Sequence, residues 1–229
     1  MRQFLSILLT GFLIFSQGER SLAQPSSINN PFAKEDANTK TVLFAPITYI
    51  GYIEKGDKIR HSDSISTITA AILTHKTQQS QAQLKADSVL PALDTATSRS
   101  VQYELGNVVN DENFGNNKRK IALPPYLDSL LMESGHTYGM ILYQNGFLRR
   151  KGNYSGQVWK SIGIGILTMG SYYTVPQKSS TNLYLFWLDG KKKTIECIAL
   201  SEMAGKDPTD PKTLDKQMQA LIENKNKKK

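Results

Sequence analysis

The sequence predicts a single mixed α/β domain with about four to five strands and helices packed on the sheet. Residues 41–53 and 138–143 are apolar, β-branched or aromatic on both faces, as in strands buried at the centre of a sheet. Helical patterns separate these two stretches, which favours parallel pairing through a crossover connection. Near the carboxyl end, a hairpin signature is followed by an amphipathic helix.

The amino-terminal half of the domain begins with the strand predicted over residues 41–53. Pro46 lacks a backbone donor, so the strand is expected to end or bulge there. Asp63 is the expected cap of a following helix. The residues at helical spacing on its predicted buried face are Ile65, Ile68 and Ile72. Residues 78–87, which are polar and rich in glutamine, fit either an exposed continuation of this helix or a linker.

Two further helices are predicted before the second long strand. The first carries apolar residues and one threonine on a single face: Leu93, Thr97, Val101, Leu105 and Val108. It gives way to residues 110–117, which have the composition of a loop. The second begins near Pro124 and Pro125, because proline is tolerated in a first helical turn, and stops at Gly135. Its apolar residues are Leu127, Leu130 and Leu131.

The carboxyl-terminal part is predicted to form a hairpin and a closing helix. Asn145–Gly146, directly after the second strand, is a turn signal. Residues 182–188 and 193–200 flank Asp189–Gly190 and predict a hairpin. Asp210 and Pro211 then open a helix. The apolar stripe of this helix consists of Leu214, Met218 and Leu221.

Residues 1–23 have the features of a cleavable secretory signal peptide. A short positive start precedes an apolar run over residues 4–15, which is shorter than the roughly 20 residues that a membrane-spanning helix needs. Small residues at Ser21 and Ala23 predict cleavage after Ala23. The alternative, a buried helix, would show an apolar stripe on one side, and the run shows none. Because Gln24 follows and not cysteine, no lipid anchor is expected at the mature amino terminus.

The rest of the chain divides into three predicted regions: a disordered lead-in over residues 24–40, the α/β domain over residues 41–222, and a basic tail over residues 223–229. The apolar stretch at residues 161–175 is interrupted by three glycines, and no membrane-spanning segment is expected in the mature chain. Whether this stretch is helix or strand stays open. It fits close backbone packing or, less simply, contact with a partner or a membrane.

The formal net charge of +8 owes much to the carboxyl terminus. The four terminal lysines are Lys225, Lys227, Lys228 and Lys229. Such a tail is ordinarily solvated, and contact with an anionic surface is the alternative. Nucleic acid is not an expected partner of an exported chain.

The sequence predicts no catalytic, cofactor-binding or metal-binding residue. The three histidines, His61, His75 and His136, have no metal-ligand spacing, and we expect them at the surface or at helix ends. A lone cysteine, Cys197, forms no internal disulfide and is expected as a buried strand residue. Gly163, Gly165 and Gly170 do not have the spacing of a dinucleotide-binding loop.

Carboxylates and the one glycosylation-type motif add no site. Caps, turns and helix faces account for the acidic residues considered, Asp63, Glu104, Asp128, Asp189 and Asp210. Residues 153–155 match an acceptor motif that is common by chance.

The order of elements resembles a known α/β domain. It is shared by the amino-terminal region of TolB, the penicillin-binding-protein activator lipoproteins and the globular part of curli-secretion channels. The segments that carry the resemblance are residues 42–46, 65–72 and 138–142, the hairpin at Asp189–Gly190 and the helix after Asp207–Pro208. The composition and leader also resemble those of small exported proteins of the Bacteroidetes. The resemblance implies a non-enzymatic envelope domain that binds other proteins.

The leading hypothesis is therefore a periplasmic or secreted accessory module whose partner is another envelope protein. The alternative is an extracytoplasmic hydrolase acting on envelope or carbohydrate material. A deep pocket with convergent carboxylates or histidines would favour the hydrolase. A shallow surface with an exposed apolar or aromatic patch would favour the module.

Overall fold

The computed structural model describes residues 40–54, 58–111, 121–150 and 177–226, with no side-chain description beyond residue 222. Several predictions fall on other residues: the signal peptide, nearly all of the lead-in, residues 161–175 with their glycines, the motif at residues 153–155, and most of the loop at residues 110–117. In the lysine tail, only the backbone of the first residues is described, as the end of the last helix.

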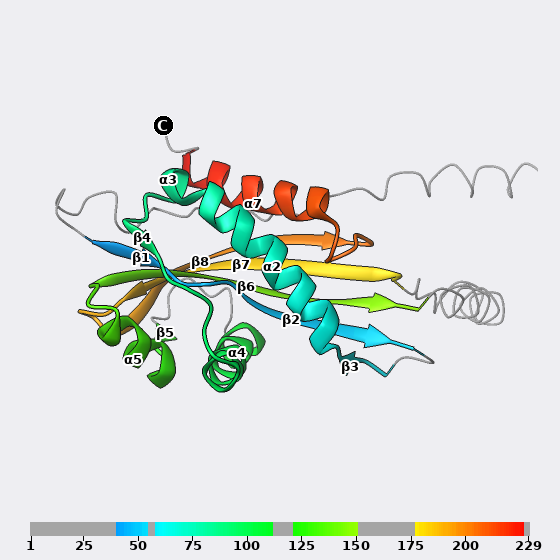
Figure 1. Cartoon of the computed structure of the whole chain (residues 1–229), viewed down its shortest axis with the longest axis horizontal. Coiled ribbons are helices and arrows are strands. Elements are labelled where there is room, and N and C mark those ends of the chain that lie inside the picture. Colours follow the sequence, from blue (N-terminus) through cyan, green and yellow to red (C-terminus); the bar gives the residue numbers. More distant parts are fainter. Residues whose placement is uncertain (1–39, 55–57, 112–120, 151–176, 227–229) are drawn as a thin grey trace, which may run out of the picture.

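A single mixed sheet forms the centre of the molecule (Figure 1). Its strands are β1 (Thr41–Leu43), β2 (Ile47–Ile53), β3 (Arg60–His61), β4 (Ser88–Val89), β5 (Ile121–Ala122), β6 (Tyr138–Arg149), β7 (Ser179–Asp189) and β8 (Thr194–Ala204). Their order is β3-β2-β6-β7-β8-β5, and β1 lies between β4 and β6. The mixed α/β fold is confirmed, and the described part of the chain has four strands of seven or more residues and four that span only two or three.

The first predicted strand is interrupted at Pro46, as its missing N–H requires. Both β1 and β2 run parallel to β6, so one long stretch of chain pairs twice with the same strand. Between the two, the Phe44 amide donates to the Met140 carbonyl at 2.8 Å, which keeps the interruption short. The predicted parallel connection between the first two long strands is confirmed.

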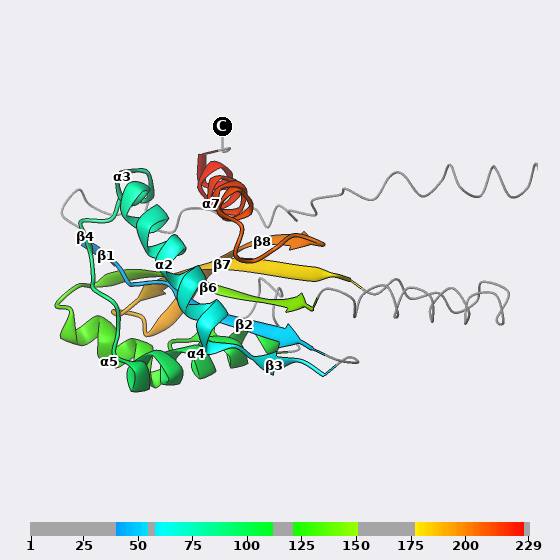
Figure 2. The same ribbon diagram turned by 45° about the vertical axis from the view of Figure 1, so that its right-hand side comes forward.

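Within the described residues, five helices cover the sheet on its two faces (Figures 1 and 2). They are α2 (Asp63–Gln79), α3 (Gln81–Leu84), α4 (Thr95–Asn110), α5 (Pro125–Glu133) and α7 (Pro211–Asn226). One apolar cluster joins α2, α3 and α7 to one face, with Leu73, Leu84 and Leu214 fully buried. A second joins α4 and α5 to the other face through Leu105 and Leu127. No helix among the described residues is long and apolar enough to cross a membrane.

The buried face of α2 differs from the one predicted. Ser66, Thr69, Leu73 and Thr77 are the buried residues, whereas Ile68 is 56% exposed. The cap is also one residue earlier, because the Ser62 hydroxyl accepts a hydrogen bond from the Ile65 amide, and Asp63 is the first helical residue. The apolar spacing gave the wrong face here because Ser66 lies toward the edge strand β2 and forms hydrogen bonds with Thr48 and Ile50.

Other local predictions are confirmed. Asp210 caps α7 by accepting from the Lys212 and Thr213 amides at 3.3 and 3.1 Å. The apolar stripe of α7 is buried, and Gly135 follows α5 at a φ of 69°. Strands β7 and β8 flank the predicted Asp189–Gly190 turn.

The turn predicted at Asn145–Gly146 is wrong. Strand β6 runs straight through both residues to Arg149 and pairs with β7 along this length. A Cβ added at Gly146 would lie 2.4 Å from the Ser180 carbonyl oxygen. The glycine therefore allows two strands to approach closely, a role that a local turn signal does not distinguish.

Candidate functional site

A shallow, mainly apolar groove of about 660 Å³ lies along α4 and the start of α5. It is open to solvent, and the residues that give it its chemical character are Arg99, Tyr103, Glu104, Pro124, Pro125 and Tyr126. The helical spacing of Arg99, Tyr103 and Glu104 places them on adjoining parts of one helix surface. The prolines and Tyr126 come from the segment that opens α5.

Glu104 fixes the two helices against each other. Its carboxylate oxygens accept hydrogen bonds from the Tyr126 and Leu127 amides at 3.0 and 3.3 Å. These amides belong to the first turn of α5, whose N-cap residue Pro124 offers no side-chain acceptor. Beneath this contact Leu105 and Leu127 are fully buried. Glu104 thus holds the two walls of the groove together. This agrees with the structural role expected for it from the sequence.

The groove presents two exposed aromatic rings beside a cation. Tyr103 is 71% exposed and Tyr126 is 53% exposed, which is unusual for such large side chains. Arg99 is also exposed and forms no ion pair with any described carboxylate. Tyrosine and arginine are the residue types enriched at protein interfaces. The arrangement suits a ligand segment that offers an apolar side chain together with an anionic group.

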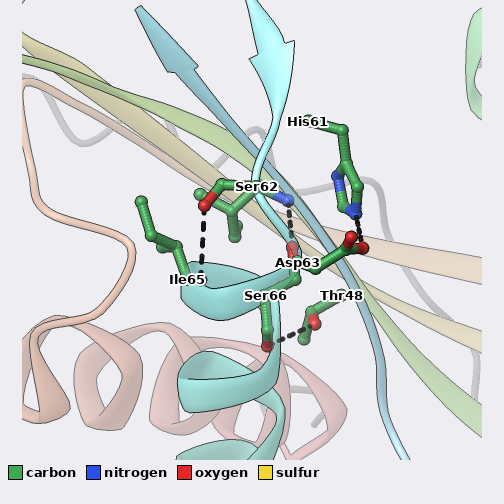
Figure 3. Close-up of polar contacts among 7 residues, drawn as sticks. Thr48, His61, Ser62, Asp63, Ile65 and Ser66 are labelled. Atoms are coloured by element: carbon green, nitrogen blue, oxygen red, sulfur yellow. Dashed lines mark hydrogen bonds and ion pairs between the residues drawn. The ribbon is translucent and has the colours of Figure 1, made fainter.

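A second polar cluster surrounds the start of α2 (Figure 3). His61 Nε2 lies 3.0 Å from Asp63 Oδ1, and the His61 ring stacks on the Tyr49 ring at a centroid distance of 4.6 Å. A histidine–aspartate pair invites comparison with hydrolase sites. Here the neighbouring Ser62 and Ser66 hydroxyls accept from the Ile65 and Ile50 amides, so both are occupied in backbone hydrogen bonds.

These hydrogen bonds close one edge of the sheet. Ser66 Oγ accepts from the Ile50 amide at 3.0 Å, the Ser62 amide donates to the Ile50 carbonyl at 3.0 Å, and the Thr48 hydroxyl donates to the Ser66 carbonyl at 2.8 Å. They supply the partners that a further strand would have given β2. The cluster at His61 is therefore an edge cover, in which the first turn of α2 replaces a strand.

The three histidines do not come together. His61 lies on β3, His75 is exposed on α2, and His136 follows α5, where its Nδ1 lies 2.7 Å from the Ser134 carbonyl oxygen. Within the part of the chain that the structure describes, no group of three His, Cys, Asp or Glu residues is placed to hold a metal ion.

Cys197 differs slightly from its expected place. It lies on β8 and is partly exposed, packing against the apolar cluster under α7. Burial of the thiol raises the pKa of Cys197 to about 11, so the thiolate is scarce at neutral pH.

The acidic residues considered from the sequence are spread over the molecule. Asp189 and Asp128 form ion pairs with Lys192 and Lys193, while Asp210 caps α7. Hydrogen bonds from the Thr213 side chain and from backbone amides hold the pKa of Asp210 below its ordinary value. Of the five residues considered, only Glu104 lines the groove.

A buried polar cluster beneath α7 is structural. Gln217 donates to the Thr181 and Ser201 carbonyls at 3.0 and 2.9 Å, and Gln144 donates to the Thr181 hydroxyl at 2.8 Å. The three side chains of Gln144, Thr181 and Gln217 are fully buried. Their hydrogen bonds join α7 to the three strands β6, β7 and β8, and the three side chains are not accessible to a ligand.

Comparison with known proteins gives a distant likeness in structure alone. No family model matches the chain, and no curated protein matches it either. The C-terminal domain of LpoB from Salmonella enterica is 9% identical, with a TM-score of 0.28, and the match covers 73% of this chain and 86% of that one. PelC from Paraburkholderia phytofirmans, solved as a dodecamer of a single-residue variant, is 11% identical, with a TM-score of 0.33, covering 81% and 84%. The chain thus has a distant structural similarity to LpoB and PelC.

Proposed function

We propose that the chain is an exported cell-envelope protein that loses residues 1–23 and binds another protein through the α4–α5 groove, without an enzymatic activity of its own. The observation that carries the binding role is the pair of exposed rings, Tyr103 and Tyr126, beside Arg99 on a shallow surface. The sequence features of the leader support export. With Gln24 at the mature start, the protein acts without an amino-terminal lipid anchor.

The groove favours a polypeptide segment over a small substrate. It is open, and the rings and prolines offer contact area at little cost in side-chain entropy. Arg99 adds charge complementarity to a carboxylate on the partner, and Glu104 is already occupied by α5. The ligand is therefore an exposed segment of an envelope protein with an apolar residue next to an acidic one.

The test is cross-linking and affinity purification of the mature chain from its native envelope, read by mass spectrometry. We expect one partner to be enriched by the wild-type chain and lost with Tyr103→Ala/Tyr126→Ala and with Arg99→Glu. Ile68→Ala is the matched control, because Ile68 is a similarly exposed apolar side chain on α2, on the opposite face.

Two results would contradict the proposal. One is the same set of partners with the wild type and both groove variants, which would remove the groove from binding. The other is hydrolysis of purified envelope glycan by the mature chain, which would restore the hydrolase alternative. Amino-terminal sequencing of the exported form checks the leader, and a retained Met1 would refute cleavage.

A further inference from the structure

Cationic side chains gather at one end of the sheet, where β2 and β6 finish and β3 and β7 begin. Residue Tyr52 on β2 is paired with Arg60 on β3, and Ile53 is paired with Arg149 on β6. The Arg150 amide donates to the Ile53 carbonyl at 2.9 Å, and the Arg149 amide donates to the Lys178 carbonyl at 3.1 Å. Pairing between strands therefore brings together residues that are far apart in the sequence (Figure 1).

We call this surface the basic end and define it by Lys58, Arg60, Arg149, Arg150 and Lys178. Four of the five are exposed, and Arg149 is partly buried. Neighbouring strands lie about 4.8 Å apart, so the distance from β3 across β2 and β6 to β7 is about 14 Å, and the five residues lie on or beside β3, β6 and β7. This row of charges lies across the ends of the strands, whereas the groove lies along α4 and α5.

Four cations of the basic end lack acidic partners. Among the described residues, Lys58, Arg60, Arg150 and Lys178 form no ion pair, although Glu54 follows β2 and Glu202 lies on β8. The fifth, Arg149, is engaged, and its Nε donates to the Gln177 carbonyl at 3.3 Å. Like charges so close together repel one another, and a cluster of cations without ion pairs is typical of a surface that binds an anion.

An exposed aliphatic side chain stands beside these charges. Ile59 is 55% exposed and lies over Gly51 on β2, where an added Cβ would come within 2.2 Å of Ile59 Cγ2. Because Gly51 has no side chain, the side chain of Ile59 can pack over it. Ile59 is flanked in the sequence by Lys58 and Arg60. Apolar side chains set among basic ones are characteristic of proteins that bind at the surface of a membrane.

The sequence between Arg150 and Gln177 has a matching composition, although it is no part of the surface defined above. Residues 151–176 contain two lysines and no Asp or Glu. They also contain Trp159 and the apolar residues 161–175, which are too few to span a bilayer. Residues 151–176 thus add no negative charge directly after Arg150, whereas Glu54 and Asp57 stand shortly before Lys58 in the sequence.

We propose that the basic end binds an anionic lipid surface. Each Lys or Arg near an anionic leaflet increases partitioning about fivefold, and salt screens the attraction beyond about 8 Å. The row of charges fits a plane of phosphate head groups, and Ile59 enters the interface between them. This surface is separate from the α4–α5 groove, so the proposal does not depend on the proposed function.

The test is co-sedimentation of the mature chain with vesicles of phosphatidylglycerol and phosphatidylcholine, and with vesicles of phosphatidylcholine alone. We expect Arg150→Glu/Lys178→Glu to lower binding to the anionic vesicles at least tenfold. The matched control is Lys212→Glu/Lys216→Glu, which changes the net charge equally on the exposed side of α7 and should lower binding less than threefold. Neither variant should bind neutral vesicles.

Two further measurements test the lysine tail as another cationic binding site and a soluble anion as another ligand. Removal of residues 225–229 tests the lysine tail; α7, which contains the first of these residues, ends away from the basic end in Figures 1 and 2. Binding that survives this truncation and is lost with the basic-end variant supports the proposal. Three results overturn it: equal loss with both charge reversals, loss on removal of the tail alone, or binding to soluble polyphosphate without binding to vesicles. Matched unfolding midpoints show that the variants are folded.

Discussion

The two ends of the sheet carry cations in opposite settings. At the β7–β8 turn, Lys192 Nζ lies 3.0 Å from Asp189 Oδ2 and 3.4 Å from Glu196 Oε1, and Lys193 pairs with Asp128. Asp189 is only 1% exposed, and its other oxygen accepts from the Lys192 amide at 2.9 Å. At the basic end, Lys58, Arg60, Arg150 and Lys178 have no such partner among the described residues. The paired end stabilises the fold, whereas the unpaired end is free to bind.

The largest expected effect of a substitution is at the paired end. Asp189→Ala removes the buried acceptor of one backbone hydrogen bond and the anion of one ion pair, so it should lower the free energy of unfolding by about 2 kcal/mol. Urea denaturation measures this. Lys178→Ala at the basic end is the control and should change the value by less than about 0.5 kcal/mol. An equal change in the free energy of unfolding for the two substitutions would contradict the conclusion that only the paired end stabilises the fold.

A smaller effect is expected in the core between the ends, on raising the pH. Burial raises the pKa of Tyr143 to about 12 because the phenolate is disfavoured inside the protein. The neutral form is thus favoured in the folded state, and stability is complete below about pH 10 and falls as the pH rises toward 12. Between about pH 9 and about pH 11 the loss due to Tyr143 should be about 1 kcal/mol. Tyr143→Phe should remove it, and an identical decline in that variant would contradict the assignment.

Lys193 allows the paired end to be tested at an exposed position. Its side chain is 53% exposed, so loss of the ion pair with Asp128 in Lys193→Ala should lower the free energy of unfolding by only about 0.5 kcal/mol. The decrease should shrink further in about 1 M salt, because exposed pairs are screened. A loss above about 2 kcal/mol would mean that this pair behaves as a buried one.

The smallest effect on stability is expected at the basic end. Arg150→Glu/Lys178→Glu relieves repulsion among unpaired cations, so it should leave the free energy of unfolding unchanged or raise it by about 0.5 kcal/mol. Thermal and urea unfolding at low salt measure the change. Clear destabilisation would show that these side chains serve the fold.

Local signals predicted most of the fold. The helix that begins at Pro211 and the hairpin at Asp189–Gly190 depend on neighbours in the sequence, so they could be predicted from it. The errors arose where distant contacts decide. Ser66 is buried because it bonds to Ile50 on the sheet edge, and Gly146 is a glycine because β7 passes close by.

The candidate surfaces were harder to foresee. In the groove, Glu104 on α4 accepts hydrogen bonds from the amides of Tyr126 and Leu127. This contact joins separate segments, so the spacing of residues in the sequence does not predict it. The basic end depends on the register that places Arg60 near Arg149 and Lys178. Its one local sign was the cationic run at residues 149–151. Which charged side chains form ion pairs, and which form none, can be determined only from the folded structure.

The most direct test of the difference between the two ends is to measure lipid binding and stability on the same sample of Arg150→Glu/Lys178→Glu. We predict at least a tenfold loss of binding to anionic vesicles with no loss in the free energy of unfolding. Retained binding, or a loss of stability of about 2 kcal/mol as expected for Asp189→Ala, would contradict the conclusion that the cations of the basic end are there to bind and not to hold the fold.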